Sequence, residues 1–224
     1  MGSGWLDKLI DVASDSIYDI FCRGSESTGK RGERLTEKEL NLLRLFGNDG
    51  KILRNLYLPK EEGSSETSET DLVFITTKGI FVIESKNYSG WIFGREQDWQ
   101  WTASLSNGQK NKFYNPIKQN RMHINCIRRF VGESTPIYSL IVFSERCVLK
   151  KVTWESPDVE VINRDETIPT VKKIWNRAPD MVTADQVEYM YEKLLPYTQV
   201  SNEVKMQHVE KIRETQGRRN NSWH

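Results

Sequence analysis

Two short apolar segments constrain the fold of this chain more than any other feature of its sequence. Residues 71–76 (DLVFIT) and 80–85 (IFVIES) consist largely of β-branched and aromatic residues, and only Thr77, Lys78 and Gly79 separate them. This pattern predicts two strands joined by a tight turn. Because consecutive residues in each segment are apolar, both faces of each strand are apolar. Such strands lie at the centre of a sheet that is covered on both sides, which predicts an α/β fold.

The rest of the chain supplies the other elements of a central mixed β-sheet flanked by helices. Further strands are expected at short apolar or aromatic runs, at residues 51–58, 91–93, 99–102, 136–143 and 159–162. Gly94 is expected in a turn between two of these strands, and the Ser-, Glu- and Thr-rich residues 61–70 are expected in a loop. Helical spacing predicts helices near 32–46 and 116–131, the second with Asn115 as its N-cap followed by a proline.

The order of these segments divides the chain into three expected units. Residues 1–31 are expected to form an N-terminal amphipathic helix and linker, residues 32–165 the core, and residues 166–224 a helical extension with a frayed tail. Within the extension, Thr183 begins a capping box and Ser201 is the expected N-cap of a last helix. The extra helices at both ends are therefore additions to one core.

The N-terminal helix has an acidic face, formed by aspartates that repeat every four residues opposite its apolar side: Asp7, Asp11, Asp15 and Asp19. Anionic lipid would repel such a face, so we expect no membrane association. The apolar side is expected to pack on the domain, on a second copy of the chain in a homodimer, or on a partner protein.

Charge and cysteine content exclude several classes of protein. The chain carries 32 basic and 31 acidic residues, for a net charge of +1, so any surface that binds nucleic acid must be local. A mean hydropathy of −0.62 and short apolar runs argue against a membrane span. The 3 cysteines are too few for a four-cysteine zinc ribbon, and their wide spacing favours reduced thiols in the cytoplasm.

Three charged residues lie at the ends of the two apolar strands. Reflection of the chain about the turn places Asp71 opposite residues 84–86, and Glu84 and Lys86 share one face of their strand. Burial of these charges singly is costly, and a divalent cation would compensate for it. Mg²⁺ prefers oxygen ligands, and a nearby ammonium would neutralise charge on a phosphate during attack by water. A solvated ion pair at the end of a hairpin is the alternative that these residues alone leave open.

Several linked motifs occur around these charges in a fixed order: Gly32-Glu33, residues 69–75 (ETDLVFI), residues 79–90 (GIFVIESKNYSG), a following Trp, and residues 115–119 (NPIKQ) with His123. In these motifs the chain resembles the nuclease-related domain (NERD) family of the PD-(D/E)xK nuclease superfamily. The resemblance implies a restriction-endonuclease-like core with Asp71 and Glu84 as metal-binding acids. It further implies Lys86 as the active-site lysine, Glu33 as an accessory acid and Gln119 as an amide that approaches the same site.

A basic stretch follows the predicted hairpin. Between Trp99 and Gly132 there is no Asp or Glu, whereas lysine and arginine recur. Basic residues beside a metal centre would hold phosphates, so the candidate substrate-binding residues are Asn115, Lys118, Arg121 and His123. A solvated basic face and an ordinary core or surface histidine are the competing interpretations. Exposed tryptophans stack on bases, but Trp91, Trp99 and Trp101 at strand spacing also suit packing in a sheet.

Together these features predict a metal-dependent nuclease that hydrolyses phosphodiester bonds of nucleic acid, with DNA as the expected substrate. We expect Mg²⁺ or Mn²⁺ to be bound by Asp71, Glu84 and the backbone carbonyl of Ser85. The candidate catalytic residues are Asp71, Glu84, Lys86, Gln119 and Glu33. A general-base role for Lys86 would require a strongly depressed pKa. The alternative function is a catalytically silent nucleic-acid-binding or adaptor module that retains the nuclease fold.

Overall fold

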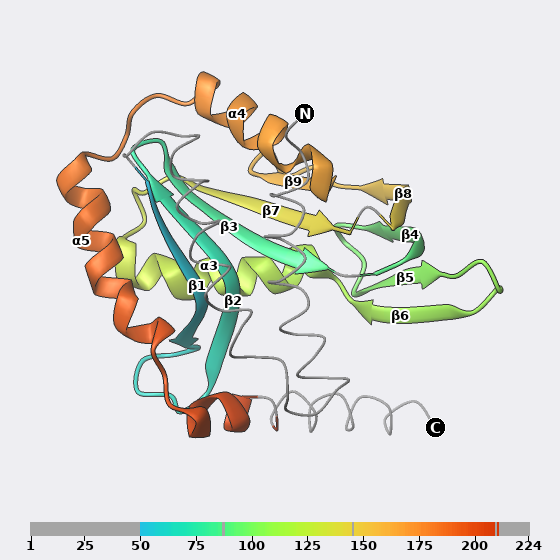
Figure 1. Ribbon diagram of the computed structural model, residues 1–224, viewed down its shortest axis with the longest axis horizontal. Coiled ribbons are helices and arrows are strands. Elements are labelled where there is room, and N and C mark those ends of the chain that lie inside the picture. The colour runs from blue at the N-terminus through green and yellow to red at the C-terminus, as the bar shows by residue number, and fades with distance from the viewer. Residues whose placement is uncertain (1–49, 87, 145, 209, 211–224) are drawn as a thin grey trace, which may run out of the picture.

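A five-stranded sheet forms the centre of the protein in a computed structural model, which describes residues 50–86, 88–144, 146–208 and 210 (Figure 1). Its order is β1-β2-β3-β7-β9, where β1 to β3 are antiparallel and β3, β7 and β9 are parallel. The strands are β1 (Lys51–Pro59), β2 (Thr67–Thr76), β3 (Gly79–Lys86), β7 (Ile137–Phe143) and β9 (Val159–Asn163). The predicted apolar hairpin, β2–β3, therefore occupies the middle of a mixed sheet, as expected for an α/β fold.

A second, four-stranded sheet of order β6-β5-β4-β8 projects from one end of the first (Figure 1). Its strands are β4 (Gly90–Arg95), β5 (Gln100–Ser104), β6 (Lys110–Tyr114) and β8 (Cys147–Thr153). Strands β6 and β8 were not predicted, because lysines interrupt their apolar residues; they pair with β5 and β4. The prediction of a turn at Gly94 is wrong. Gly94 lies within β4, where an added Cβ would lie 2.2 Å from the Trp101 ring.

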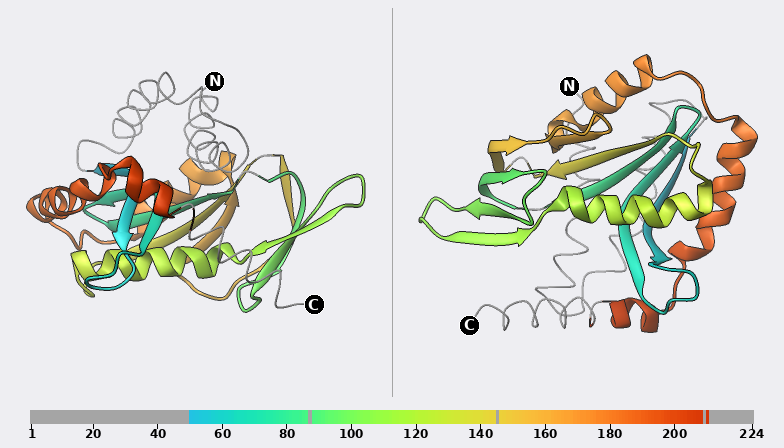
Figure 2. Two further views of the ribbon diagram at one scale, coloured as in Figure 1. Left: turned by 90° about the horizontal axis from the view of Figure 1, so that it is seen from below. Right: turned by 180° about the vertical axis from the view of Figure 1, so that it is seen from behind.

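The helices cover both faces of the main sheet (Figure 2). On one face, α3 (Pro116–Val131) and α5 (Ala184–Leu194) bury Ile127 and Met190 against β1, β2 and β3. On the other face, α4 (Thr167–Arg177) buries Val171 and Ile174 against the same strands and β7. Short 3-10 turns, Arg164–Glu166 (η1) and Leu195–Thr198 (η2), precede α4 and follow α5. None of the helices in the described ranges is both long and apolar enough to cross a bilayer.

The strand alternation changes phase beside Asp71, which the sequence pattern did not indicate. Strand β2 begins at Thr67, so the prediction of a loop through residue 70 is wrong at its C-terminal end. Leu53 and Leu56 in β1 pack in the same core cluster although they are three positions apart, and Asn55 between them has a positive φ of 45°. The register places Asn55 across from Asp71. Asp71 therefore lies at a change of phase, where its carboxylate reaches the Ser85 N–H instead of the apolar core.

The predicted caps of the described helices are present. Asn115 accepts a hydrogen bond from the Ile117 N–H, and Thr183 forms a capping box with Gln186. Ser201 Oγ accepts from the Val204 N–H at the start of the helical residues 202–208. The expected N-terminal helix, the helix over 32–46 and the frayed tail lie outside the described residues, as does Glu33. The boundaries of the three expected units stay a prediction.

Asn115 also fixes the position of α3 relative to the second sheet. Its Nδ2 donates to the backbone carbonyls of Arg95, Glu96 and Asp98, at 3.1, 2.9 and 2.7 Å. These carbonyls belong to the end of β4 and the turn that follows it. The N-terminus of α3 is thus attached to the β4–β5 connection by one buried side chain.

We expect Asn115→Ala to lower the free energy of unfolding by about 2–3 kcal/mol, since it removes an N-cap and the Nδ2 donor to the carbonyls of Glu96 and Asp98. The control is Thr183→Ala, which removes a solvent-exposed cap of α5 and should cost about 1 kcal/mol. Urea unfolding followed by circular dichroism measures both. Equal losses for the two variants would contradict a bridging role for Asn115.

Candidate active site

The side chains of Asp71, Glu84 and Lys86 meet at the open end of the β2–β3 hairpin, as the sequence predicts. The register pairs Leu72 with Ile83, so the next positions bring Asp71 beside Glu84. Both carboxylates are buried, with Asp71 2% and Glu84 0% exposed. The Ser85 N–H donates to Asp71 Oδ2 at 2.9 Å, and Lys86 Nζ donates to Glu84 Oε1 at 2.7 Å. The hairpin alone therefore assembles two acids and a cation.

Helix α3 adds two side chains to this cluster from one of its flanks. Lys86 Nζ also donates to Gln119 Oε1 at 3.0 Å, so the ammonium bridges β3 and α3. One turn later, His123 Nε2 lies 3.1 Å from Glu84 Oε2, while His123 Nδ1 is bonded to Ser68 Oγ at 2.6 Å. The spacing of four residues places Gln119 and His123 on the same side of the helix. The predicted approach of Gln119 to the same site is thus present in the structure, through its contact with Lys86.

The surroundings of Asp71 and Glu84 shift the pKa values of the two acids in opposite directions. Burial and the nearby charge of Glu84 raise the pKa of Asp71 well above its usual range. Burial alone would also raise the pKa of Glu84, but Lys86 and His123 outweigh it and lower that pKa to about 2. Burial is the largest single effect and would lower the pKa of Lys86, but the acidic groups around the ammonium, with Glu84 foremost, together raise that pKa, so the lysine stays protonated. Because the pKa of Lys86 is raised, a charge-stabilising role suits this lysine better than a general-base role.

The donor set suits a hard divalent cation. Glu84 Oε2 and His123 Nε2 are buried and lie 3.1 Å apart, and neither atom has any other polar partner among the described residues. A buried carboxylate oxygen that is so incompletely satisfied is costly. Within the described ranges, no group of three or more His, Cys, Asp or Glu side chains is arranged to hold a metal ion. Mg²⁺ is commonly held by one or two carboxylates, with waters and substrate phosphate as the remaining ligands. Asp71 and Glu84 match that smaller set of two carboxylates. The backbone of Ser85, which follows Glu84 and precedes Lys86, lies beside them.

Comparison with known proteins agrees with this geometry. The model of the family described as nuclease-related domain matches residues 28–144, which is just over half of the chain. The chain belongs to the nuclease-related domain family. An uncharacterized protein of Bacillus anthracis, pXO1-01, is 30% identical over 181 residues, which cover 81% of this chain and 82% of that protein. No solved structure matches the chain.

The other residues predicted to bind substrate lie elsewhere on α3 of the nuclease-related domain. Asn115 is fully buried and bonded to backbone groups. Arg121 follows Gln119 by two residues, about 200° around the helix, and forms an ion pair with Glu96. Burial would raise the pKa of Glu96, but backbone N–H groups and Arg121 lower it to about 2. Lys118 lies over the ring of Trp99, with Nζ 5.7 Å from the ring centroid. The structure therefore brings only Gln119 and His123 to the acids.

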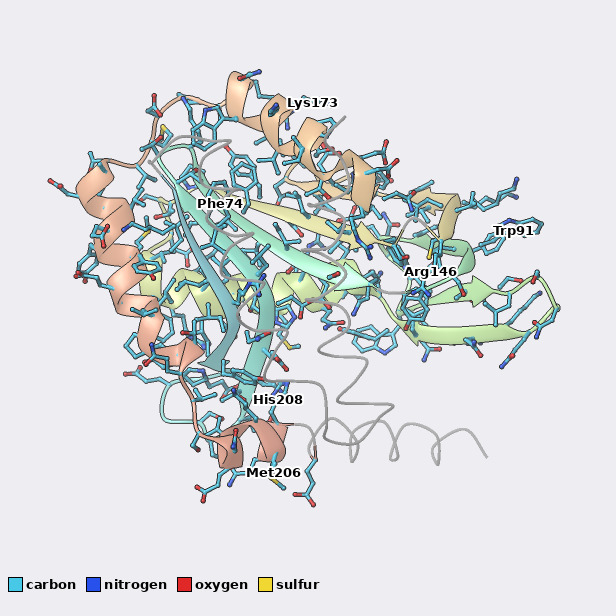
Figure 3. All side chains as sticks on the ribbon, viewed as in Figure 1. Phe74, Trp91, Arg146, Lys173, Met206 and His208 are labelled. Atoms are coloured by element: carbon cyan, nitrogen blue, oxygen red, sulfur yellow. The ribbon has the colours of Figure 1, made fainter. Side chains whose placement is uncertain are left out.

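A second polar cluster beside the site was not predicted. Tyr57 donates to Glu69 Oε1 at 2.5 Å, and His208 Nε2 lies 3.6 Å from Glu69 Oε2. His208 belongs to the C-terminal helical segment and lies against β2 (Figure 3). Burial raises the pKa of Glu69 and lowers that of His208. The motif ETDLVFI contains Glu69, but residues 61–70 were interpreted as a loop, and no sequence pattern connects them to residue 208.

The raised pKa of Asp71 predicts that its ionised carboxylate lowers the free energy of unfolding of the metal-free protein. A carboxyl whose pKa is raised on folding contributes stability below its unfolded value near 3.8, and this contribution is lost as pH rises toward the folded value. At mildly alkaline pH in EDTA, Asp71→Asn should therefore raise the free energy of unfolding by at least about 1 kcal/mol. Urea unfolding across a pH series measures the effect.

Asp180→Asn is the matched control, because Asp180 is an exposed carboxylate whose pKa is lowered by Lys78 and Thr77. Its replacement should not raise stability at any pH. If Asp71→Asn destabilised the protein as well, the charge of Asp71 would already be compensated within the cluster.

Proposed function

We propose that this nuclease-related domain protein is a metal-dependent nuclease that hydrolyses phosphodiester bonds of nucleic acid, with DNA as the expected substrate. The observation that carries the proposal is the buried set of Asp71, Glu84 and Lys86, joined to Gln119 by a single ammonium. Two buried carboxylates with one cation leave a negative site that needs a further positive charge. A divalent cation and a phosphate together satisfy both the acids and the lysine.

In the proposed reaction each residue has a role that follows from its contacts. Asp71 and Glu84 would hold Mg²⁺ or Mn²⁺, with the Ser85 carbonyl as a further oxygen ligand. When bound, the ion supplies Lewis acidity to the phosphate and the attacking water. Lys86 stays protonated and stabilises the negative charge that develops on the phosphate. Gln119 and His123 are positioning residues, because they contact Lys86 and Glu84 respectively.

The decisive test is cleavage by variants of the hairpin end. Wild-type protein should cut plasmid, linear duplex or single strands in Mg²⁺ or Mn²⁺ and should be inactive in EDTA. Asp71→Ala, Glu84→Ala and Lys86→Ala should each lower the cleavage rate by at least about a hundredfold, because each removes a group that acts on the transition state. Gel assays with the three substrate forms give the rates.

Lys78→Ala is the matched control for Lys86. Lys78 lies at the turn of the same hairpin and forms an ion pair with Asp180 at 3.0 Å, far along the strands from the acids. This variant should cleave at the wild-type rate. Folded wild-type protein that cuts none of the substrates with any metal would contradict the nuclease and favour a silent nucleic-acid-binding module.

Gln119→Ala tests the positioning of the lysine separately. Loss of its amide frees Lys86 Nζ from α3 while the two acids are retained. We expect the cleavage rate to fall about 10–100-fold, with Mn²⁺ affinity by titration calorimetry unchanged. A rate equal to that of wild type would show that Glu84 alone positions the ammonium.

A further inference from the structure

The outer face of the second sheet is strongly basic. Its four strands contain Arg95, Lys110, Lys112, Lys150 and Lys151 and no acidic residue. Arg95 is paired with Asp98 in the adjoining turn, so the four lysines carry the charge of this face. In a chain whose net charge is only +1, this concentration marks a local surface for a polyanion.

The register places three of these lysines and an exposed tryptophan on one face, and the fourth, Lys150, lies at the bulge in β8 and covers the ring of that tryptophan, Trp91. Cross-strand pairing aligns two rows of outward side chains, Val148–Trp91–Ser104–Lys110 and Lys151–Phe93–Thr102–Lys112. The intervening residues point inward, where Ile92, Trp101 and Ala103 are buried in a core cluster. The outer face thus combines apolar rings and ammonium groups on a rigid sheet.

Two tryptophans, Trp91 in β4 and Trp99 in the connection between β4 and β5, are exposed to a similar extent. Trp91 is 52% and Trp99 is 59% exposed, whereas Trp101 is buried. A lysine covers each exposed ring, Lys150 at 5.5 Å from the Trp91 centroid and Lys118 at 5.7 Å from the Trp99 centroid. Figure 3 shows Trp91 pointing away from the body of the protein. Exposure of large rings in this setting costs hydration free energy that a stacked base would recover.

Helix α3 contacts both the exposed ring of Trp99 and the candidate active site. Lys118, which covers Trp99, is followed by Gln119, which accepts from the Lys86 ammonium. At the same end of the helix, Tyr88 stacks on Phe113 of β6 with ring centroids 4.3 Å apart, two residues after Lys86. Two consecutive residues of α3 thus contact the exposed ring of Trp99 and the active-site lysine.

From this arrangement we propose that the outer face of the second sheet, together with Trp99 in the adjoining β4–β5 connection, binds single-stranded nucleic acid, with bases stacked on Trp91 and Trp99 and phosphates held by the lysines. The inference rests on the proposed function, because it identifies the form of substrate that the site receives. Single strands are favoured because the base faces of a duplex are already stacked on one another, whereas unpaired bases stack on exposed aromatic rings without sequence preference. Lysines alternating with aromatic rings match the alternation of phosphate and base.

The test measures binding without cleavage. In EDTA, fluorescence anisotropy with a labelled oligothymidylate should show tighter binding than with a duplex of the same length, and the affinity should fall as salt is raised. Trp91→Ala and Trp99→Ala should each weaken oligothymidylate binding about tenfold, as expected for loss of one stacked base. Trp91→Phe should recover most of the affinity, because it keeps a ring at the site.

The matched control is Tyr189→Ala. Tyr189 on α5 is 61% exposed and is covered by Lys193 at 5.5 Å, so it forms the same kind of ring and lysine pair away from the second sheet. This variant should bind oligothymidylate as tightly as wild type. Unchanged affinity in both tryptophan variants, preference for duplex, or binding to anionic vesicles in place of oligothymidylate would overturn the inference.

The two proposals fail independently. Binding that depends on Trp91 in a protein that cuts nothing with any metal would uphold the basic face and refute the nuclease. Metal-dependent cutting with binding that is indifferent to both tryptophans would uphold the nuclease and refute the basic face.

Discussion

The ion pair between Lys86 and Glu84 is the interaction on which the rest of the site depends. Two carboxylates lie beside each other out of contact with water, and such an arrangement is unfavourable unless cations neutralise it. Lys86 neutralises Glu84 and holds its pKa low, whereas burial and the negative charge of Glu84 raise the pKa of Asp71. The same imbalance that makes the metal-free site costly makes it suited to a divalent cation. Stability and proposed chemistry therefore share one electrostatic cause.

Helix α3 connects the parts of the molecule that this cluster needs. Its inner flank supplies Gln119 and His123 to the acids, and its N-terminus is fixed to the β4–β5 connection by Asn115. The residue before Gln119 lies over Trp99, so one helical turn contacts both the Lys86 ammonium and the exposed ring of Trp99. A small shift of α3 would change both contacts together. This arrangement explains why the helix begins with a fully buried cap instead of an exposed one.

Much of the site was predictable because it is local in sequence. The hairpin brings Asp71, Glu84 and Lys86 together through one short turn, and a spacing of four residues aligns Gln119 with His123. The second sheet was harder to predict, since lysines interrupt the apolar residues of β6 and β8, which pair with β5 and β4. The cluster of Tyr57, Glu69 and His208 was not predictable at all, because it joins segments from opposite ends of the described chain.

The amino-acid sequence by itself determined the apolar hairpin and the charges at its end, because reflection about a tight turn depends only on the distance between residues along the chain. It also determined the extent of α3, since a cap and a helical apolar stripe are local signals. Only the tertiary structure decided which side of α3 faces the acids, why Arg121 pairs with Glu96 instead, and which tryptophans are exposed. These outcomes depend on packing between distant segments and on the phase change at Asn55, which no local pattern encodes.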